Sequence, residues 1–182
     1  MNIFYLDHDA TTCAEMHNNK HVVKMILEYA QLLSTAHRVL DGEEHIYLRN
    51  GRKKRVWDLL DKREHILYSA THINHPSAIW VRKTHQNYMW LAQLLGELCY
   101  EYTHRYEKTH KVERDGLMNV LQTNLPRNIP IGAFTAPTPA MPDEVKIPGD
   151  SLASYRNYYI NNKAHLANWK KRQVPEWFNA NV

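Results

Sequence analysis

The sequence predicts an all-α fold, a single helical domain over residues 1–182, and three observations support this prediction. Apolar residues recur at helical spacing over long stretches that begin with capping residues. Glycine is scarce, with only 6 in 182 residues, which disfavours a fold rich in strands and tight turns. The balance of 43% hydrophobic and 23% charged residues is ordinary for one globular domain of this length.

The chain is expected to begin with a short extended segment, residues 2–6, followed by a long first helix. Thr11 or Thr12 is the predicted N-cap of this helix, because a hydroxyl can accept a hydrogen bond from the free amides of the first turn. The helical pattern continues to about Arg38 or Leu40 and stops before an Asp-Gly pair.

Two further helices are expected in the middle of the chain. The polar and basic stretch from Gly42 to Arg55 predicts a loop or a hairpin, and a second helix is expected from Val56 to about Thr71. A His-Pro pair then starts the third, long helix, since proline is favoured in a first helical turn. This helix is expected to run from Pro76 to about His104.

The last third of the chain is expected to combine an ordered loop with one more helix. Residues 108–115 are charged and predicted to be solvated, whereas residues 124–150 are proline-rich. A loop of that length is uncommon without a function, and we expect it to pack in an ordered form over the helices. Asp150 or Ser151 should cap a last helix to about Trp169, before a basic and aromatic tail, residues 170–182.

Composition narrows the setting and the partners. Cys13 and Cys99 lie in helical patterns and are expected to be small buried residues of a reducing compartment. No apolar run approaches the roughly 18 residues of a membrane span, so we expect a cytoplasmic protein without a membrane partner. The net charge of +4 and the 5 Trp and 11 Tyr suit an anionic partner with stacking rings, DNA or a nucleotide.

Polar residues form a stripe along one side of the predicted first helix. At helical spacing they fall within an arc of about 100°, while the rest of that helix is largely apolar. The members of this stripe are His17, Lys20, His21, Lys24, Glu28, Gln31 and Thr35. Imidazoles, an amide and one carboxylate suit proton transfer and hydrogen bonding. We expect the stripe to line a functional site, the alternative being a plain solvated face.

A metal site on the same stripe is the second alternative. His17 and His21 lie one helical turn apart, as zinc ligands on a helix do. The metalloprotease pattern requires Glu after the first His, but position 18 is Asn, and Lys20 and Lys24 would repel a cation. We therefore expect neither a metal nor another cofactor.

The start of the third predicted helix is a second candidate region. Its free backbone amides suit a phosphate, and Arg82, about two turns along, suits a bidentate phosphate contact. The alternative is a plain capped helix start at His75 with Trp80 in the core.

Three segments follow one another in a distinctive order. They are Ala-x-x-His-x-x-Lys-His-x-x-Lys-x-x-x-Glu-x-x-Gln-Leu (14–32), His-Pro-Ser-Ala-x-Trp (75–80) and Tyr-Arg-x-Tyr-Tyr (155–159). This pattern resembles the superfamily of bacteriophage pyrimidine-dimer DNA glycosylases of the endonuclease V type and their bacterial relatives, over about half of the chain. Residues 138–144 also resemble small phage proteins.

The resemblance implies a helical, phage-encoded enzyme that acts on a nucleobase or its glycosidic bond. In that family the nucleophile is an N-terminal amine, assisted by a glutamate on the first long helix. This sequence departs from the family in one respect, because Asn2 follows Met1 and a bulky second residue normally leaves the methionine in place. Lys20 or Lys24 would replace the amine only if its pKa were lowered.

The predicted function is therefore a DNA glycosylase or base-modifying enzyme that acts on a flipped nucleotide. Glu28 is expected to stabilise an oxocarbenium-like sugar or activate a water, His17 or His21 to protonate the leaving base, and Lys24 to take part as a catalytic cation. The expected substrate-binding residues are Lys20, Gln31, His75, Trp80, Arg82, Tyr155, Arg156, Lys163 and Arg172.

Two other function classes remain open from the sequence. One is a non-catalytic protein that binds nucleic acid or a host factor, whose binding would depend on the basic run Arg52–Arg55 and tolerate loss of Glu28. The other is an enzyme that acts on free nucleotides with the same basic and aromatic groups.

Overall fold

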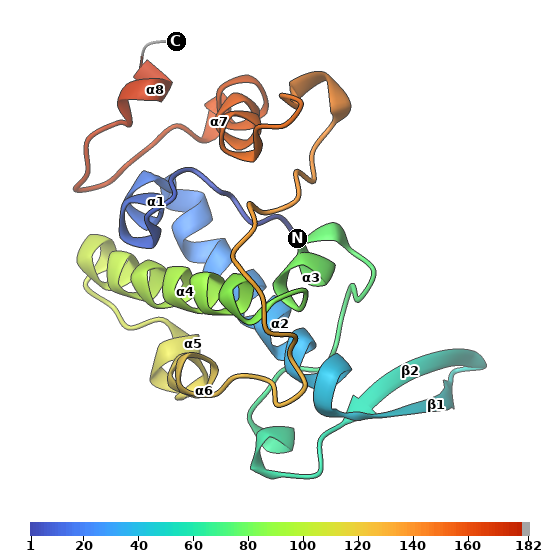
Figure 1. The fold of residues 1–182 in the computed structure, drawn as a ribbon. Helices are drawn as coiled ribbons and strands as arrows, with labels where there is room; N and C mark the ends of the chain where they lie inside the picture. The colour runs from blue at the N-terminus through green and yellow to red at the C-terminus, as the bar shows by residue number, and fades with distance from the viewer. Residues whose placement is uncertain (180–182) are drawn as a thin grey trace.

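Two long helices, α2 (Asn19–Asp41) and α4 (His85–Tyr106), pack against each other at the centre of the molecule (Figure 1). Their facing sides bury apolar side chains such as Ile26, Leu33 and Leu95 in one continuous cluster. This computed structural model describes residues 1–179, and the backbone alone at Arg49. The last three positions of the predicted tail, 180–182, lie outside the described residues.

The predicted first helix is two helices, so its expected continuity was wrong. α1 (Ala10–Met16) is capped by Asp9, whose side chain accepts from the backbone N–H of Thr12, and neither Thr11 nor Thr12 is the N-cap. The backbone is extended at His17, and the side chain of Asn18 caps α2 by accepting from the N–H of His21. Short polar side chains compete with the helix in this way, which explains the break.

The helix predicted from Pro76 is also interrupted. His75 caps α3 (Pro76–Val81), and its ring nitrogen accepts from the N–H of Ser77. The helix ends at Val81, and α4 begins after Thr84, which caps it by accepting from Asn87. In the sequence, Thr84 looks like one more threonine of a helical pattern. Its capping bond starts α4 as a helix separate from α3.

A two-stranded antiparallel sheet occupies the stretch predicted as a loop or hairpin and extends to Asp58, into the start of the second predicted helix. Strand β1 (Glu43–Arg49) pairs with β2 (Arg52–Asp58) through a turn at Asn50-Gly51, both with positive φ. That dipeptide is the strongest short hairpin signal, because its conformation follows the strand twist. A short 3-10 helix, η1 (Lys62–His65), is the only helix among residues 56–71. Helices therefore dominate a fold that is not purely all-α.

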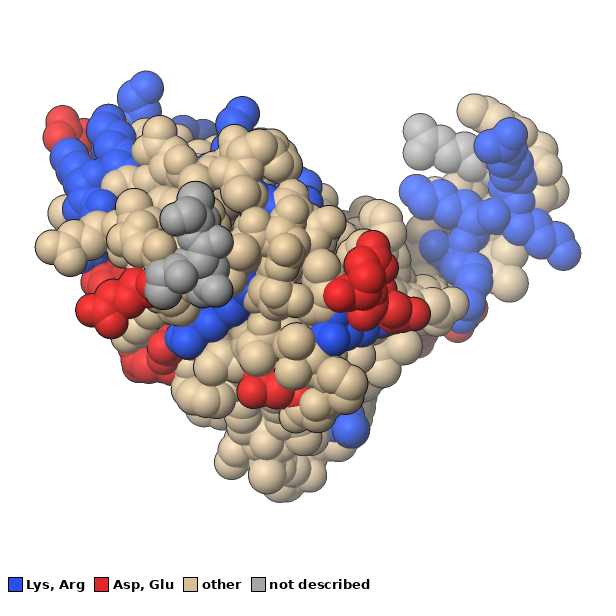
Figure 2. Space-filling view, turned by 90° about the horizontal axis from the view of Figure 1, so that it is seen from above, with Lys and Arg blue, Asp and Glu red and all other residues tan. Residues whose placement is uncertain are grey.

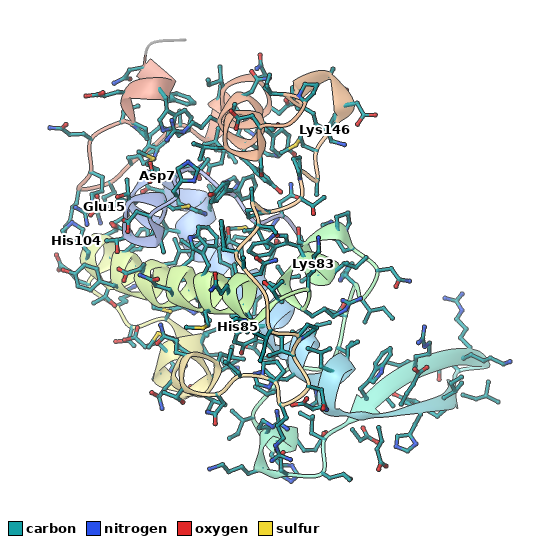
Figure 3. The ribbon with its side chains drawn as sticks, in the orientation of Figure 1. Asp7, Glu15, Lys83, His85, His104 and Lys146 are labelled. Carbon is teal, nitrogen blue, oxygen red and sulfur yellow. The ribbon has the colours of Figure 1, made fainter. Side chains whose placement is uncertain are left out.

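The proline-rich segment, residues 124–150, is an ordered loop that crosses over α3 and α4 (Figure 1). The ring of His85, labelled in Figure 3, accepts from the N–H of Gly132, and Trp80 donates to the carbonyl of Thr135. Before it lie two helices that the sequence did not predict, α5 (Lys111–Arg114) in the stretch expected to be solvated and α6 (Leu117–Thr123) after that stretch. A 3-10 helix, η2 (Asp143–Val145), interrupts the loop.

The C-terminal part of the described chain contains α7 (Ser151–Asn162), η3 (Ala164–Leu166) and α8 (Glu176–Asn179). Asp150 caps α7, but this helix ends at Asn162 and does not reach Trp169 as predicted. Trp169 is buried and donates to the carbonyl of Met16, which fixes the segment after α7 to α1. None of the helices within residues 1–179 is long and apolar enough to span a membrane.

Candidate functional site

The start of the chain is fixed against α2. Residues 3–6 are buried, and the N–H of Phe4 donates to the hydroxyl of Tyr29 at 3.0 Å. On the other side, the hydroxyl of Ser77 in α3 donates to the carbonyl of Met1 at 3.2 Å. These contacts hold the Met1 amino group 3.9 Å from Oε2 of Glu28.

The carboxylate of Glu28 lies between two cationic groups. Its Oε2 faces the Met1 amine, and its Oε1 is 3.2 Å from Nζ of Lys24. The side chain of Glu28 is only 15% exposed, whereas that of Lys24 is 68% exposed. The carboxylate is therefore held by the fold, while the lysine is free to follow a ligand.

His75 stands close enough to this pair to feel its charge. Burial lowers the pKa of His75, and its electrostatic interactions with the Met1 amine and His72 lower it further, against a smaller opposite effect of Glu28. The ring is therefore neutral at neutral pH. Its capping bond to the N–H of Ser77 fixes its position at the start of α3.

The exposed side of α2 is hollowed into two adjoining pockets, which we call the α2 groove. The first, of about 460 Å³, is lined by Val23, Lys24, Leu27, Glu28, Gln31, Tyr68, His110, Lys111 and Val112. The second, of about 610 Å³, is lined by Asn19, Lys20, His21, Val23, Lys24, Tyr106, Lys163 and Leu166. The pockets share Val23 and Lys24, and both lie in the size range of small-molecule sites.

The chemistry of the α2 groove is mixed in a way that suits a nucleotide. Val23 and Leu27 are each 42% exposed and give it an apolar surface. Lys20, Lys24 and Lys163 add positive charge, and Gln31 adds an amide. An apolar surface accommodates a base, and the ammonium groups attract phosphates.

His17 lies beneath this site and not in it. Its ring is fully buried, with Nδ1 bonded to the carbonyl of Cys13 at 2.7 Å and Nε2 to the hydroxyl of Tyr29 at 3.2 Å. Burial lowers the pKa of His17 to about 4, so the ring is neutral at neutral pH. Since both ring nitrogens are engaged, His17 holds the break between α1 and α2 in place.

His21 lines the groove, but as part of an aromatic stack. Its ring is stacked on Phe4 at 4.1 Å, and Nδ1 is 2.5 Å from the hydroxyl of Tyr159. Burial lowers the pKa of His21 to about 3. Residues 1–179 contain no group of three or more His, Cys, Asp or Glu side chains arranged to hold a metal ion.

The groove thus brings together six of the predicted site residues, with a seventh beside the Met1 amine. The six are Lys20, His21, Lys24, Glu28, Gln31 and Lys163. The seventh is His75, which reaches the site from α3. Helical periodicity indicated those of these residues that lie on α2. It did not distinguish His21, which lines the groove, from His17, which does not.

Two aromatic residues predicted to stack on a base are core residues. Trp80 is 2% exposed, and its indole N–H donates to the carbonyl of Thr135. Tyr155 has no exposed surface, and its hydroxyl donates to the carbonyl of Thr138. Both fasten the proline-rich loop to the helices, a use that residue type alone does not distinguish from base stacking.

The predicted phosphate-binding arginines lie outside the groove and are engaged within the protein. Arg156 donates to the carbonyl of Leu6 and is 3.3 Å from Asp7, which Figure 3 labels. Arg172 forms ion pairs with the carboxylates of Glu15 and Glu101. Arg82 donates to the carbonyl of Ala78, one turn before it in α3.

Sequence reasoning missed the most informative group, the Met1 amine. The sequence predicted that a retained methionine puts an amine-based step in doubt, and it did not foresee where the Met1 amine lies. The structure places the amine of the retained Met1 beside Glu28, because the buried run at residues 3–6 directs the chain start toward α2. The apolar run that begins at Ile3 signalled a buried chain start, but it did not signal the contact with Glu28.

No family model matches the chain, and no match was found among curated proteins or solved structures. The similarity to the pyrimidine-dimer glycosylases therefore stays a prediction based on the three quoted segments.

Proposed function

We propose that the chain is a DNA-acting enzyme of glycosylase type whose reacting groups are the Met1 amine and Glu28. The observation that carries the proposal is the distance of 3.9 Å between this amine and the Glu28 carboxylate, at the edge of an open groove. An amine beside a carboxylate on the first long helix is also the arrangement that the sequence resemblance implies.

The amine is a better nucleophile than the lysines that the sequence suggested. The Met1 amine is held 3.9 Å from the Glu28 carboxylate, and the Met1 side chain is only 6% exposed, so the fold positions this nucleophile beside a group that can accept its proton. Lys20 is exposed and Lys24 is 68% exposed, so the fold positions neither lysine in this way. The proposed role of Lys24 is to attract phosphate.

The first step forms a bond between the amine nitrogen and C1′ of a flipped nucleotide. The bond from C1′ to the base breaks, and the base leaves with its electron pair and takes a proton from water, whose hydroxide neutralises the proton released in the final hydrolysis. Glu28 stabilises the positive charge that develops on the sugar and accepts a proton from the amine. His17 and His21 are neutral and engaged, so they do not serve as the acid.

The second step opens the sugar ring. The nitrogen lone pair forms a double bond to C1′, the bond from C1′ to O4′ breaks, and O4′ takes the proton held by Glu28. Water then hydrolyses this iminium, which restores the amine and leaves an abasic site in the DNA. The groove supports these steps by holding the base against Val23 and Leu27 and the flanking phosphates at Lys20 and Lys163.

An extended N-terminus tests the role of the amine. Two residues added before Met1 should move the amine away from Glu28 and abolish base release from duplexes that carry damaged or modified bases. The assay is a panel of such duplexes, together with normal duplexes and free nucleotides, scored for released base and for strand nicks.

The matched control carries the same two residues after Val182 and should keep full activity. Full activity of the N-terminally extended protein would contradict the proposed nucleophile. Base release from free nucleotides alone would contradict DNA as the substrate.

A further inference from the structure

The hairpin formed by β1 and β2 projects from the rest of the molecule (Figures 1 and 2). Its base is anchored where Trp57 is buried and Arg38 donates to the Trp57 carbonyl at 2.8 Å. Beyond that point every described side chain from Glu43 to Arg55 is exposed, including Ile46 at 62% and Leu48 at 71%. An isolated two-stranded ribbon with exposed aliphatic residues is only marginally stable, which indicates that this hairpin serves a partner.

The exposed part of the hairpin carries four consecutive cations, Arg52 to Arg55, and Figure 2 shows Lys and Arg gathered on this projection. Arg55 pairs with Glu44 at 2.6 Å. Among the described side chains, Arg52, Lys53 and Lys54 have no carboxylate within ion-pair distance. Their positive charge is therefore available to a polyanion.

The register places these cations on both faces of the ribbon. Lys53 is paired with Leu48 on one face, and Lys54 is paired with Tyr47 on the other, because successive side chains of a strand alternate. Arg52 shares the face of Lys54. A ligand that offers negative charge on two opposite sides fits this arrangement better than a flat anionic surface.

The major groove of duplex DNA has that shape. A ribbon with side chains on both faces is roughly 10 Å thick, close to the width of the major groove, about 12 Å, and too thick for the minor groove, about 6 Å. The two phosphate backbones then face opposite sides of the ribbon.

We propose that the hairpin is a docking arm that enters the major groove of duplex DNA, with Arg52, Lys53 and Lys54 contacting both phosphate backbones. This inference rests on the proposed function in taking duplex DNA as the partner. The arm would hold the duplex while the α2 groove receives one nucleotide.

The test is duplex binding measured over a range of salt concentrations. The variant Arg52→Gln, Lys53→Gln, Lys54→Gln should lose roughly tenfold or more in affinity at about 0.1 M salt, and its salt slope should fall by about 2.7 because each lost phosphate contact contributes about 0.9. The matched control, Lys108→Gln, Arg114→Gln, Lys146→Gln, removes the same charge from exposed or partly exposed positions outside the hairpin and the groove, and should change neither quantity substantially.

A second duplex addresses the groove itself. Bulky substituents at the 5-position of its cytosines fill the major groove and should weaken binding of the parent protein, with little further loss in the hairpin variant. Equal binding and salt slope of parent and hairpin variant, or equal losses in the control variant, would overturn the proposal. A changed oligomeric state of the hairpin variant, with duplex binding intact, would overturn it in favour of a protein interface.

These readouts involve binding alone, so they are independent of the chemistry. Hairpin-dependent binding without any base release would count against the proposed function and leave the docking arm in place. Base release that does not depend on the hairpin would count against the docking arm and leave the proposed function in place.

Discussion

Replacing Glu28 by Gln should lower the rate of base release by on the order of a hundredfold to ten-thousandfold, the contribution of a positioned acid–base group. The amide keeps the size of the side chain but can neither accept a proton from the Met1 amine nor balance positive charge on the sugar. Duplex binding should be retained, because Lys20, Lys24 and Lys163 are unchanged. The measurement is single-turnover base release, with duplex affinity determined on the same preparation.

Glu144→Gln is the matched control for this substitution. Glu144 is exposed in the proline-rich loop, outside the α2 groove, so its variant should keep the parent rate. Retained full activity of Glu28→Gln would remove Glu28 from the mechanism. A loss of binding equal to the loss of rate would instead make Glu28 a positioning residue for the lysines.

Replacing Arg105 by Met should lower the free energy of unfolding by about 3 kcal/mol or more, as expected when one member of a buried ion pair is removed. Arg105 has no exposed surface, and it donates to the carbonyls of Glu15 and His17 and to the side chain of Asn19. It also pairs with the buried carboxylate of Glu101. The substitution leaves these acceptors at the break between α1 and α2 without their donor.

The stability prediction is measured by chemical denaturation, with Arg114→Met as the control. Arg114 is 63% exposed, and its substitution should change the free energy of unfolding by no more than about 0.5 kcal/mol. A change below about 1 kcal/mol for Arg105→Met would contradict the view that this arginine holds the break between the helices.

The sequence predicted which side chains share one face of α2 but not where this helix begins. Helical periodicity grouped Lys24, Glu28 and Gln31 correctly, because spacing along a helix decides which side chains share a face. The break at His17 was not predicted, since a capping asparagine resembles any other polar residue of a stripe. Burial of His17 follows from that break, and it separates this residue from the site.

The other errors have the same physical origin, a residue type that serves more than one purpose. Trp80 and Arg156 are types that bind nucleic acids, yet both fasten loops through hydrogen bonds to backbone carbonyls. The Asn50-Gly51 turn lies in the stretch that the sequence predicted as a loop or hairpin, and the helical pattern assigned from Val56 concealed only the end of the second strand, residues 56–58. Proximity of Met1 to Glu28 depends on tertiary packing, which no local pattern encodes.

The most direct test of the proposed chemistry is reductive trapping with a duplex that carries one abasic site. Borohydride reduces an iminium to a stable amine, so any nucleophilic amine becomes covalently joined to the DNA, and digestion followed by mass spectrometry identifies the peptide. We predict one adduct, at the α-amino group of the peptide that begins with Met1, and none in the N-terminally extended protein. Absence of an adduct, or an adduct at Lys20 or Lys24, would contradict the assignment of the Met1 amine as nucleophile.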